Sequence, residues 1–192
     1  MRRLSVLAVS LFVLGSVSAQ KLSGSLAPLK GQKEVNVVID FSKTLVNGDP
    51  ESKYIAEETK EKSKTEKEKW LKEWNEDLRS QAYTVLTNDL GKNLNVGLFS
   101  VGNYPKAEYT INIKVIDITT GFFAGPFTKA SMVKAEVKFI KTGGTSPIAT
   151  VLYKKSCSAI SSTIPYFVTR IVMSFGKLGD DIAKTINKNM KK

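Results

Sequence analysis

Two segments of alternating hydrophobicity constrain the fold of this chain more than any other feature. They are AEYTINIKVIDI (107–118) and ASMVKAEVKFIK (130–141). Because side chains alternate between the two faces of a β-strand, each segment is predicted to be a strand with one buried and one wet face. The apolar positions are Tyr109, Ile111, Ile113 and Val115 in the first segment, and Val133, Ala135, Val137 and Phe139 in the second. One-sided strands of this kind are typical of an antiparallel sheet.

Further strands are expected on both sides of this pair. EVNVVIDF (34–41) alternates in the same way, and NVGLFSV (95–101) is a short candidate. PIATVLYKKSCSA (147–159) follows the Gly143-Gly144 turn and continues the meander. The strands predict a mainly antiparallel sheet of four to five members.

The segment between the predicted strands 34–41 and 95–101 predicts a helix. Residues 57–69 contain five Glu and five Lys without a large apolar side chain, which is typical of a solvated helical face or a frayed helix start. An apolar stripe with spacings of three and four follows, made of Trp70, Trp74, Leu78, Ala82, Val85, Leu86 and Leu90. Such a stripe indicates an amphipathic helix that covers a sheet.

The last thirty residues predict a second amphipathic helix. Ser162 or Thr163 can cap it, and Pro165 fits its first turn. Its apolar stripe is Ile171, Phe175, Leu178, Ile182 and Ile186. Gly176 and Gly179 weaken the middle of this helix and indicate a kink or close packing there. The complete order predicts an α+β domain with both helices packed on one face of the sheet.

The N-terminus has the pattern of an export signal. Arg2 and Arg3 precede an apolar run, and Val17-Ser18-Ala19 is a small-residue cleavage site. We expect residues 1–19 to be a signal peptide cleaved after Ala19, which places the protein in the periplasm or at the outer membrane. Residues 20–32 are then a flexible leader, and residues 33–192 a single domain. An uncleaved anchor is the alternative.

Composition excludes several kinds of chemistry. The chain has no histidine, so Ser-His-Asp and Cys-His catalysis and the common His-ligated zinc sites are excluded. Its only cysteine, Cys157, cannot form an internal disulfide. Ser131 and Lys134 match an S-x-x-K motif, but in a strand these two side chains point to opposite faces. Neighbouring Asp180 and Asp181 diverge by about 100° on a helix and do not converge on a ligand. We therefore expect no enzyme and no cofactor.

The order of elements resembles a loose group of bacterial envelope proteins. The similarity lies in AEYTINIKVIDITTG and ASMVKAEVKFIKTGG, including Ala107, Tyr109 and Gly121, followed by a strand and a Leu/Ile-rich helix. The group includes periplasmic domains related to the N-terminal domain of TolB, penicillin-binding-protein activator lipoproteins and exported families of Bacteroidetes-like bacteria. This chain lacks their lipid-bearing cysteine. The resemblance implies a non-catalytic domain that docks onto other envelope components.

Two surfaces are candidates for binding. The hairpin connection DITTGFFAGPFTKA (117–130) carries Phe122, Phe123 and Phe127. We expect at least two of these rings to pack over the helix layer, and an exposed tip that inserts into a partner or a membrane is the alternative. The wet face of the sheet carries Lys114, Lys134 and Lys138.

Three functions follow from these surfaces. The first is a docking or assembly module with an envelope protein partner. The second is a salt-sensitive binder of anionic envelope polymer or lipid headgroups, because the net charge is +11 and stays at +9 without Arg2 and Arg3. The third is a hydrolase with an unrecognised carboxylate site. The export signal disfavours nucleic acid as a partner.

Overall fold

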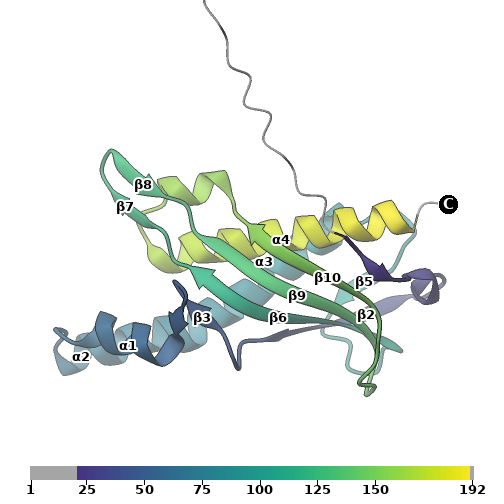
Figure 1. Ribbon diagram of the computed structural model, residues 1–192, viewed down its shortest axis with the longest axis horizontal. Helices are drawn as coiled ribbons and strands as arrows, with labels where there is room; N and C mark the ends of the chain where they lie inside the picture. Colours follow the sequence, from purple (N-terminus) through teal and green to yellow (C-terminus); the bar gives the residue numbers. More distant parts are fainter. Residues whose placement is uncertain (1–20, 191–192) are drawn as a thin grey trace, which may run out of the picture.

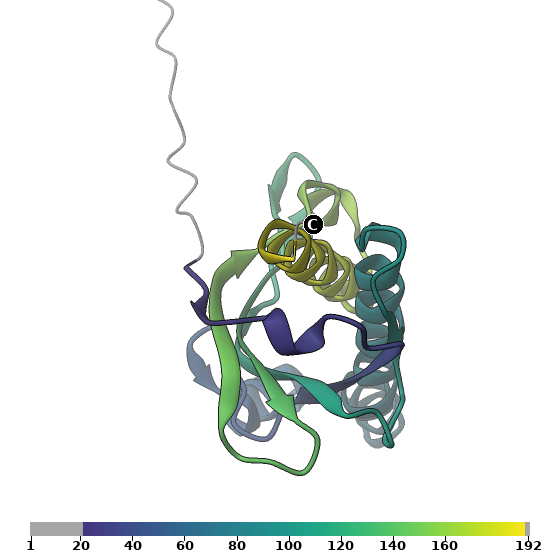
Figure 2. The same ribbon diagram turned by 90° about the vertical axis from the view of Figure 1, so that its right-hand side faces the viewer.

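The computed structural model describes residues 21–190, and the predicted signal peptide lies outside them. It is a mixed α+β domain in which two long helices lie side by side on one face of a curved, mostly antiparallel sheet (Figures 1 and 2). The strand order is β1-β10-β9-β6-β2-β5, with two short strands, β3 and β4, attached beside β6. None of the described helices is long and apolar enough to cross a membrane.

The predicted meander forms the centre of the sheet. β6 (Tyr109–Thr119), β9 (Met132–Lys141) and β10 (Pro147–Ser156) pair antiparallel in sequence order. Their inward side chains are buried as the alternation predicts, including Ile111, Ile113, Val115, Val133, Ala135, Val137 and Phe139. A bulge after Val115 adds one residue to β6, so that Ile118 is also buried.

The first predicted strand makes the sheet mixed. β2 (Glu34–Asp40) pairs parallel with β6 and also with β5 (Ser100–Gly102). β3 (Leu45–Val46) continues parallel to β6 and forms a small hairpin with β4 (Asp49–Pro50). A helical crossover between β2 and the later strands brings the chain back to the end where it started, which is the usual origin of parallel pairing. The prediction of four to five strands was too low, because these short strands carry little sequence signal.

The predicted leader is part of the domain. β1 (Ser23–Gly24) pairs antiparallel with β10, and a 3₁₀ turn, η1 (Ala27–Leu29), follows. Leu26 and Leu29 are buried in the core. Figure 2 shows this segment crossing the open end between the sheet and the helices. A mobile leader was therefore the wrong prediction for residues 21–32, because two leucines spaced for one turn are enough to anchor a polar segment.

The charged segment is helical but interrupted. α1 (Glu51–Thr59) ends before α2 (Lys64–Lys72), which begins at a capping box formed by Ser63 and Glu66. An aromatic cluster holds both helices to the body of the protein. Trp70 and Trp74 stack at 5.5 Å between ring centroids, and Tyr54 of α1 lies 5.0 Å from Trp74.

A π turn keeps the apolar stripe in register. Apolar residues recur every four positions from Trp70 to Leu90, and in an uninterrupted α-helix this spacing drifts by about 40° per repeat. The π turn Glu73–Asp77 joins α2 to α3 (Leu78–Asn93) and inserts extra residues into one turn. The insertion offsets part of the drift, so that both tryptophans and the leucines of α3 are buried.

The last helix begins later than predicted. α4 (Phe167–Asn189) starts after Pro165, and the segment before it forms a short 3₁₀ helix, η3 (Ala159–Thr163). The hydroxyls of Ser162 and Thr163 bond to carbonyls inside η3 instead of capping α4. The predicted stripe from Ile171 to Ile186 is fully buried.

Two glycines let α4 approach α3 closely. A side chain at Gly179 would collide with the backbone of Leu86 and Leu90, and one at Gly176 would collide with Val85 and Asp89. The sequence predicted either a kink or close packing at these two glycines. The structure shows close packing.

Candidate functional site

The hairpin between β6 and β9 forms a small sheet of its own. β7 (Phe122–Ala124) and β8 (Phe127–Lys129) pair antiparallel around the two-residue turn Gly125-Pro126. Gly125 has φ +60°, which suits the first central position of a tight hairpin turn. Gly121 at the base has φ +65°, and a side chain there would collide with the backbone of Lys129 and Ala130. The predicted loop is therefore an ordered projection from one end of the main sheet (Figure 1).

All three phenylalanines of the hairpin are exposed. The exposed fractions are 47% for Phe122, 41% for Phe123 and 74% for Phe127. The expectation that at least two rings pack over the helix layer was wrong, because the two-stranded hairpin extends past that layer. Ile160 of η3, which packs beside the hairpin, is 61% exposed. Together these four side chains form the aromatic patch.

The base of the hairpin is held by a buried arginine of α4. Arg170 donates from Nε to the carbonyl of Thr120 at 3.0 Å, and from Nη1 to the carbonyls of Ile164 and Pro165 at 2.8 and 3.0 Å. No carboxylate among residues 21–190 forms an ion pair with it. Burial lowers the pKa of Arg170, whose charge is met only by carbonyl dipoles. Asn47 adds a second clamp, since its Oδ1 accepts a hydrogen bond from the N–H of Thr120 at 3.0 Å.

The serine of the S-x-x-K motif has a structural role. Ser131 Oγ lies 2.6 Å from Ser174 Oγ and donates to the carbonyl of Arg170, while Ser174 donates to the carbonyl of Ser131. Both hydroxyls are fully buried, whereas Lys134 points into solvent on the other face of β9. This arrangement joins the end of the hairpin to α4 and leaves no nucleophile beside an amine.

The three predicted lysines lie on the outer face of the sheet, and each has an acidic residue as a register partner or in contact. Lys114 of β6 is the register partner of Glu136, which also binds Lys138 at 2.9 Å. Lys134 is the register partner of Asp117. The centre of this face is therefore close to charge-balanced, and it is a poor surface for binding a polyanion by charge alone.

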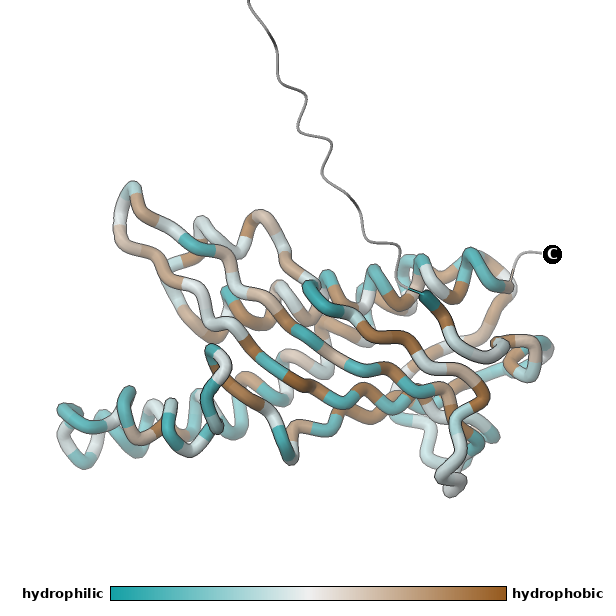
Figure 3. The backbone as a smooth tube through the Cα atoms, in the orientation of Figure 1, coloured by the Kyte–Doolittle hydropathy of each residue, from teal (hydrophilic) through white to brown (hydrophobic). Residues whose placement is uncertain are grey.

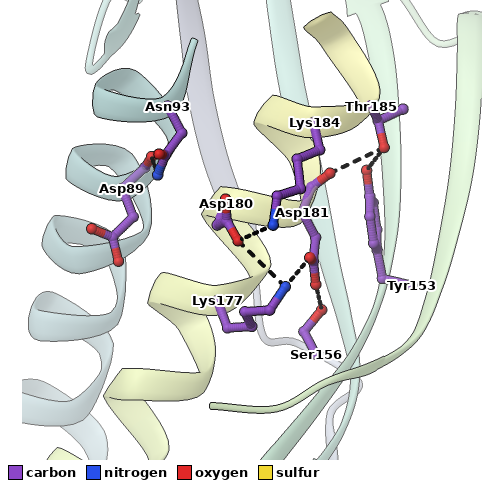
Figure 4. Close-up of polar contacts among 9 residues, drawn as sticks. All are labelled: Asp89, Asn93, Tyr153, Ser156, Lys177, Asp180, Asp181, Lys184 and Thr185. Carbon is purple, nitrogen blue, oxygen red and sulfur yellow. Dashed lines mark hydrogen bonds and ion pairs between the residues drawn. The ribbon is translucent and has the colours of Figure 1, made fainter. Parts of the chain in front are cut away.

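A second polar cluster lies along α4 (Figure 4). Lys177 bridges Asp180 at 3.4 Å and Asp181, while Lys184 binds Asp180 at 2.7 Å. Burial disfavours the charge of Asp180, but the hydrogen bond from Lys184 and the two lysine charges outweigh it, so its pKa lies below its ordinary value. Asp181 accepts a hydrogen bond from Ser156 of β10.

This cluster borders a groove of about 490 Å³ between α3 and α4. The groove also contains Asp89, which stands on the opposite wall (Figure 4). Asp180 and Asp181 were predicted not to converge on a common ligand, but both carboxylates approach the same Lys177 Nζ, Asp180 at 3.4 Å and Asp181 more closely. No group of three metal-ligating side chains occurs within residues 21–190.

Sequence reasoning missed several residues of the hairpin end. Ile160 falls between the predicted strand 147–159 and the predicted last helix, and Arg170 lies within that helix without being singled out. Lys129 lies within the quoted hairpin segment and Lys155 within a predicted strand, but neither was nominated. An arginine between apolar residues on the core side of a helix was the available signal for Arg170.

Comparison with known proteins adds little to this description. No family model matches the chain, and no curated protein matches it. Among solved structures, the chain is similar to the PelC dodecamer from Paraburkholderia phytofirmans, with 10% identity over 84% of this chain and 96% of that chain and a TM-score of 0.45. A variant of that dodecamer matches at 10% identity over 90% of this chain and 98% of that chain, with a TM-score of 0.42. Likeness at this level carries no functional argument.

Proposed function

We propose that this protein is a non-catalytic, exported docking module of the cell envelope that binds through its β7–β8 hairpin. The observation that carries the proposal is the exposure of three phenylalanines on one ordered projection. Large exposed aromatic clusters are disfavoured in a protein that stays free in solution, and they are typical of surfaces that a partner covers.

The way the hairpin is held supports the same role. Arg170, Asn47 and the Ser131–Ser174 pair fix its base with buried hydrogen bonds. A projection of this kind presents its side chains in a defined arrangement, which lowers the entropy cost of binding. The acidic residues beside the lysines of the sheet face do not favour a polyanion site at its centre, and the lysine-bridged aspartates of α4 do not favour a hydrolase.

The proposal is tested by the distribution of the protein in cells of its source organism. We expect the variant F122S/F123S/F127S to move from the envelope fraction to the soluble exported fraction by at least about tenfold, because buried aromatic anchors dominate interface energies. The substitution V96S is the matched control, since Val96 is fully exposed in another part of the molecule. A triple variant that is folded and still fractionates like the wild type would refute the docking role of the hairpin.

A further inference from the structure

Four exposed lysines lie near the base of the hairpin, on the side of β8, β9 and β10. Lys129 belongs to β8, Lys134 to the start of β9, and Lys154 and Lys155 to the end of β10. Between Tyr153 and Ser156, three steps along β10 match two along β9, and this bulge leaves both lysines exposed in succession. We call these four residues the lysine collar.

The collar has more positive charge than the acidic residues beside it balance. None of the four lysines forms an ion pair among residues 21–190. The nearest acidic residue in register is Asp117, opposite Lys134, and its Oδ1 accepts a hydrogen bond from the N–H of Gly48. Segments 118–135 and 147–179, which carry the hairpin and the collar, contain no Asp or Glu. The β3–β4 hairpin beside them contributes Asp49, which is already paired with Lys53 at 3.0 Å.

The aromatic side chains project from both faces of the hairpin. Register pairs share a face, so Phe122, Ala124 and Phe127 lie on one side, and Phe123 with Thr128 lies on the other. A groove on a folded protein covers one side of a hairpin. A fluid apolar layer surrounds both sides, and aromatic rings are favoured where such a layer meets water.

We propose that the partner of the hairpin is an anionic lipid surface, an inference that rests on the docking function proposed above. The aromatic patch inserts at the level of the headgroups, and the lysine collar binds the anionic headgroups around it. The two parts act together, because one apolar contact or one basic patch alone gives only weak, reversible membrane binding. Figure 3 shows the hydropathy along the backbone, with apolar residues in the hairpin and hydrophilic positions at its base.

The inference is tested by cosedimentation of the purified mature chain with vesicles of phosphatidylcholine, with and without phosphatidylglycerol. We expect binding only with phosphatidylglycerol, and we expect it to be lost between about 0.1 M and about 1 M salt, where the Debye length falls from roughly 10 to 3 Å. The variant K129Q/K134Q/K154Q/K155Q removes four contacts worth about fivefold each, so its affinity falls by at least about tenfold even if only some reach the surface.

The matched control is K30Q/K33Q/K106Q/K141Q, which makes the same change in net charge at the opposite end of the sheet. All four of these lysines are exposed, and we expect their replacement to lower affinity by less than about threefold. Insertion is read separately from F127W, whose fluorescence is expected to shift to the blue with anionic vesicles, while that of V96W stays unchanged. The wild-type tryptophans are buried and form a constant background.

Three results would overturn the lipid surface as partner. These are an absence of binding to anionic vesicles at low salt, equal losses in the two lysine variants, and an unchanged F127W spectrum. If any of them occurs while F122S/F123S/F127S still leaves the envelope fraction, the hairpin docks on a protein and the docking function stands. If the triple variant stays in the envelope fraction, the docking function itself fails.

Discussion

At the scale of single residues, the most consequential side chain is a buried arginine that has no ion pair within residues 21–190. Arg170 is 6% exposed, and the three carbonyls that it binds come from the base of the hairpin and from the linker that leads into α4. A buried charge held only by dipoles is tolerated when its geometry is fixed on several sides. Arg170 therefore positions the hairpin without belonging to its contact surface.

We expect R170M to lower the free energy of unfolding by about 2–4 kcal/mol, because it leaves three buried carbonyls without donors. The substitution R79M is the comparison. Arg79 has an ion pair with Glu51 at 3.0 Å and lies over the ring of Phe41, but it is partly exposed. Its loss should lower stability by only about 1 kcal/mol. Denaturant titration with unchanged m-values measures both, and an R170M variant as stable as R79M would contradict the positioning role.

At the scale of elements, local patterns predicted most of the fold, and non-local pairing was what they could not supply. The alternation around Ile111 and Val137 identified both strands and their buried faces, because that signal is carried by neighbouring residues. The parallel position of β2 beside β6 depends on how far the helical crossover carries the chain. Exposure of Phe122 and Phe123 depends on where the helix layer ends. Neither the span of the crossover nor the end of the helix layer is encoded in a local pattern.

The glycines of α4 were predictable in kind, because a weakened helix centre indicates a special contact. We expect G179A to lower the free energy of unfolding by about 1–3 kcal/mol, since the added methyl group meets the backbone of Leu86 and Leu90 and the two helices must separate. The control is G91A on α3, where the added atom meets only Val101 at 3.4 Å. Because alanine has the higher helix propensity, we expect G91A to raise the free energy of unfolding by roughly 0.5–1 kcal/mol. Thermal unfolding of both variants measures these changes. Equal changes in stability for G179A and G91A would exclude close packing as the reason for a glycine at position 179.

At the scale of the whole molecule, the domain is closed by the segment that sequence reasoning set aside. The sheet and the two long helices leave an opening at one end, and residues 21–32 run across it (Figure 2). Polar residues and Pro28 suggested mobility, yet Leu26 and Leu29 each bury a side chain in the core. Residues 21–32 are thus an integral part of the core, at the end of the molecule away from the hairpin (Figure 1).

This closure makes a prediction that separates the two interpretations of the segment. If residues 21–32 were mobile, L29A would leave stability unchanged. Because Leu29 is 1% exposed, we expect L29A to lower the free energy of unfolding by about 2–5 kcal/mol, the usual cost of truncating a buried leucine. K30A at the next, exposed position should change it by less than about 0.5 kcal/mol. Vesicle binding of folded L29A should match that of the wild type, because the cavity lies at the opposite end from the aromatic patch. An L29A protein as stable as K30A would show that the segment does not close the core.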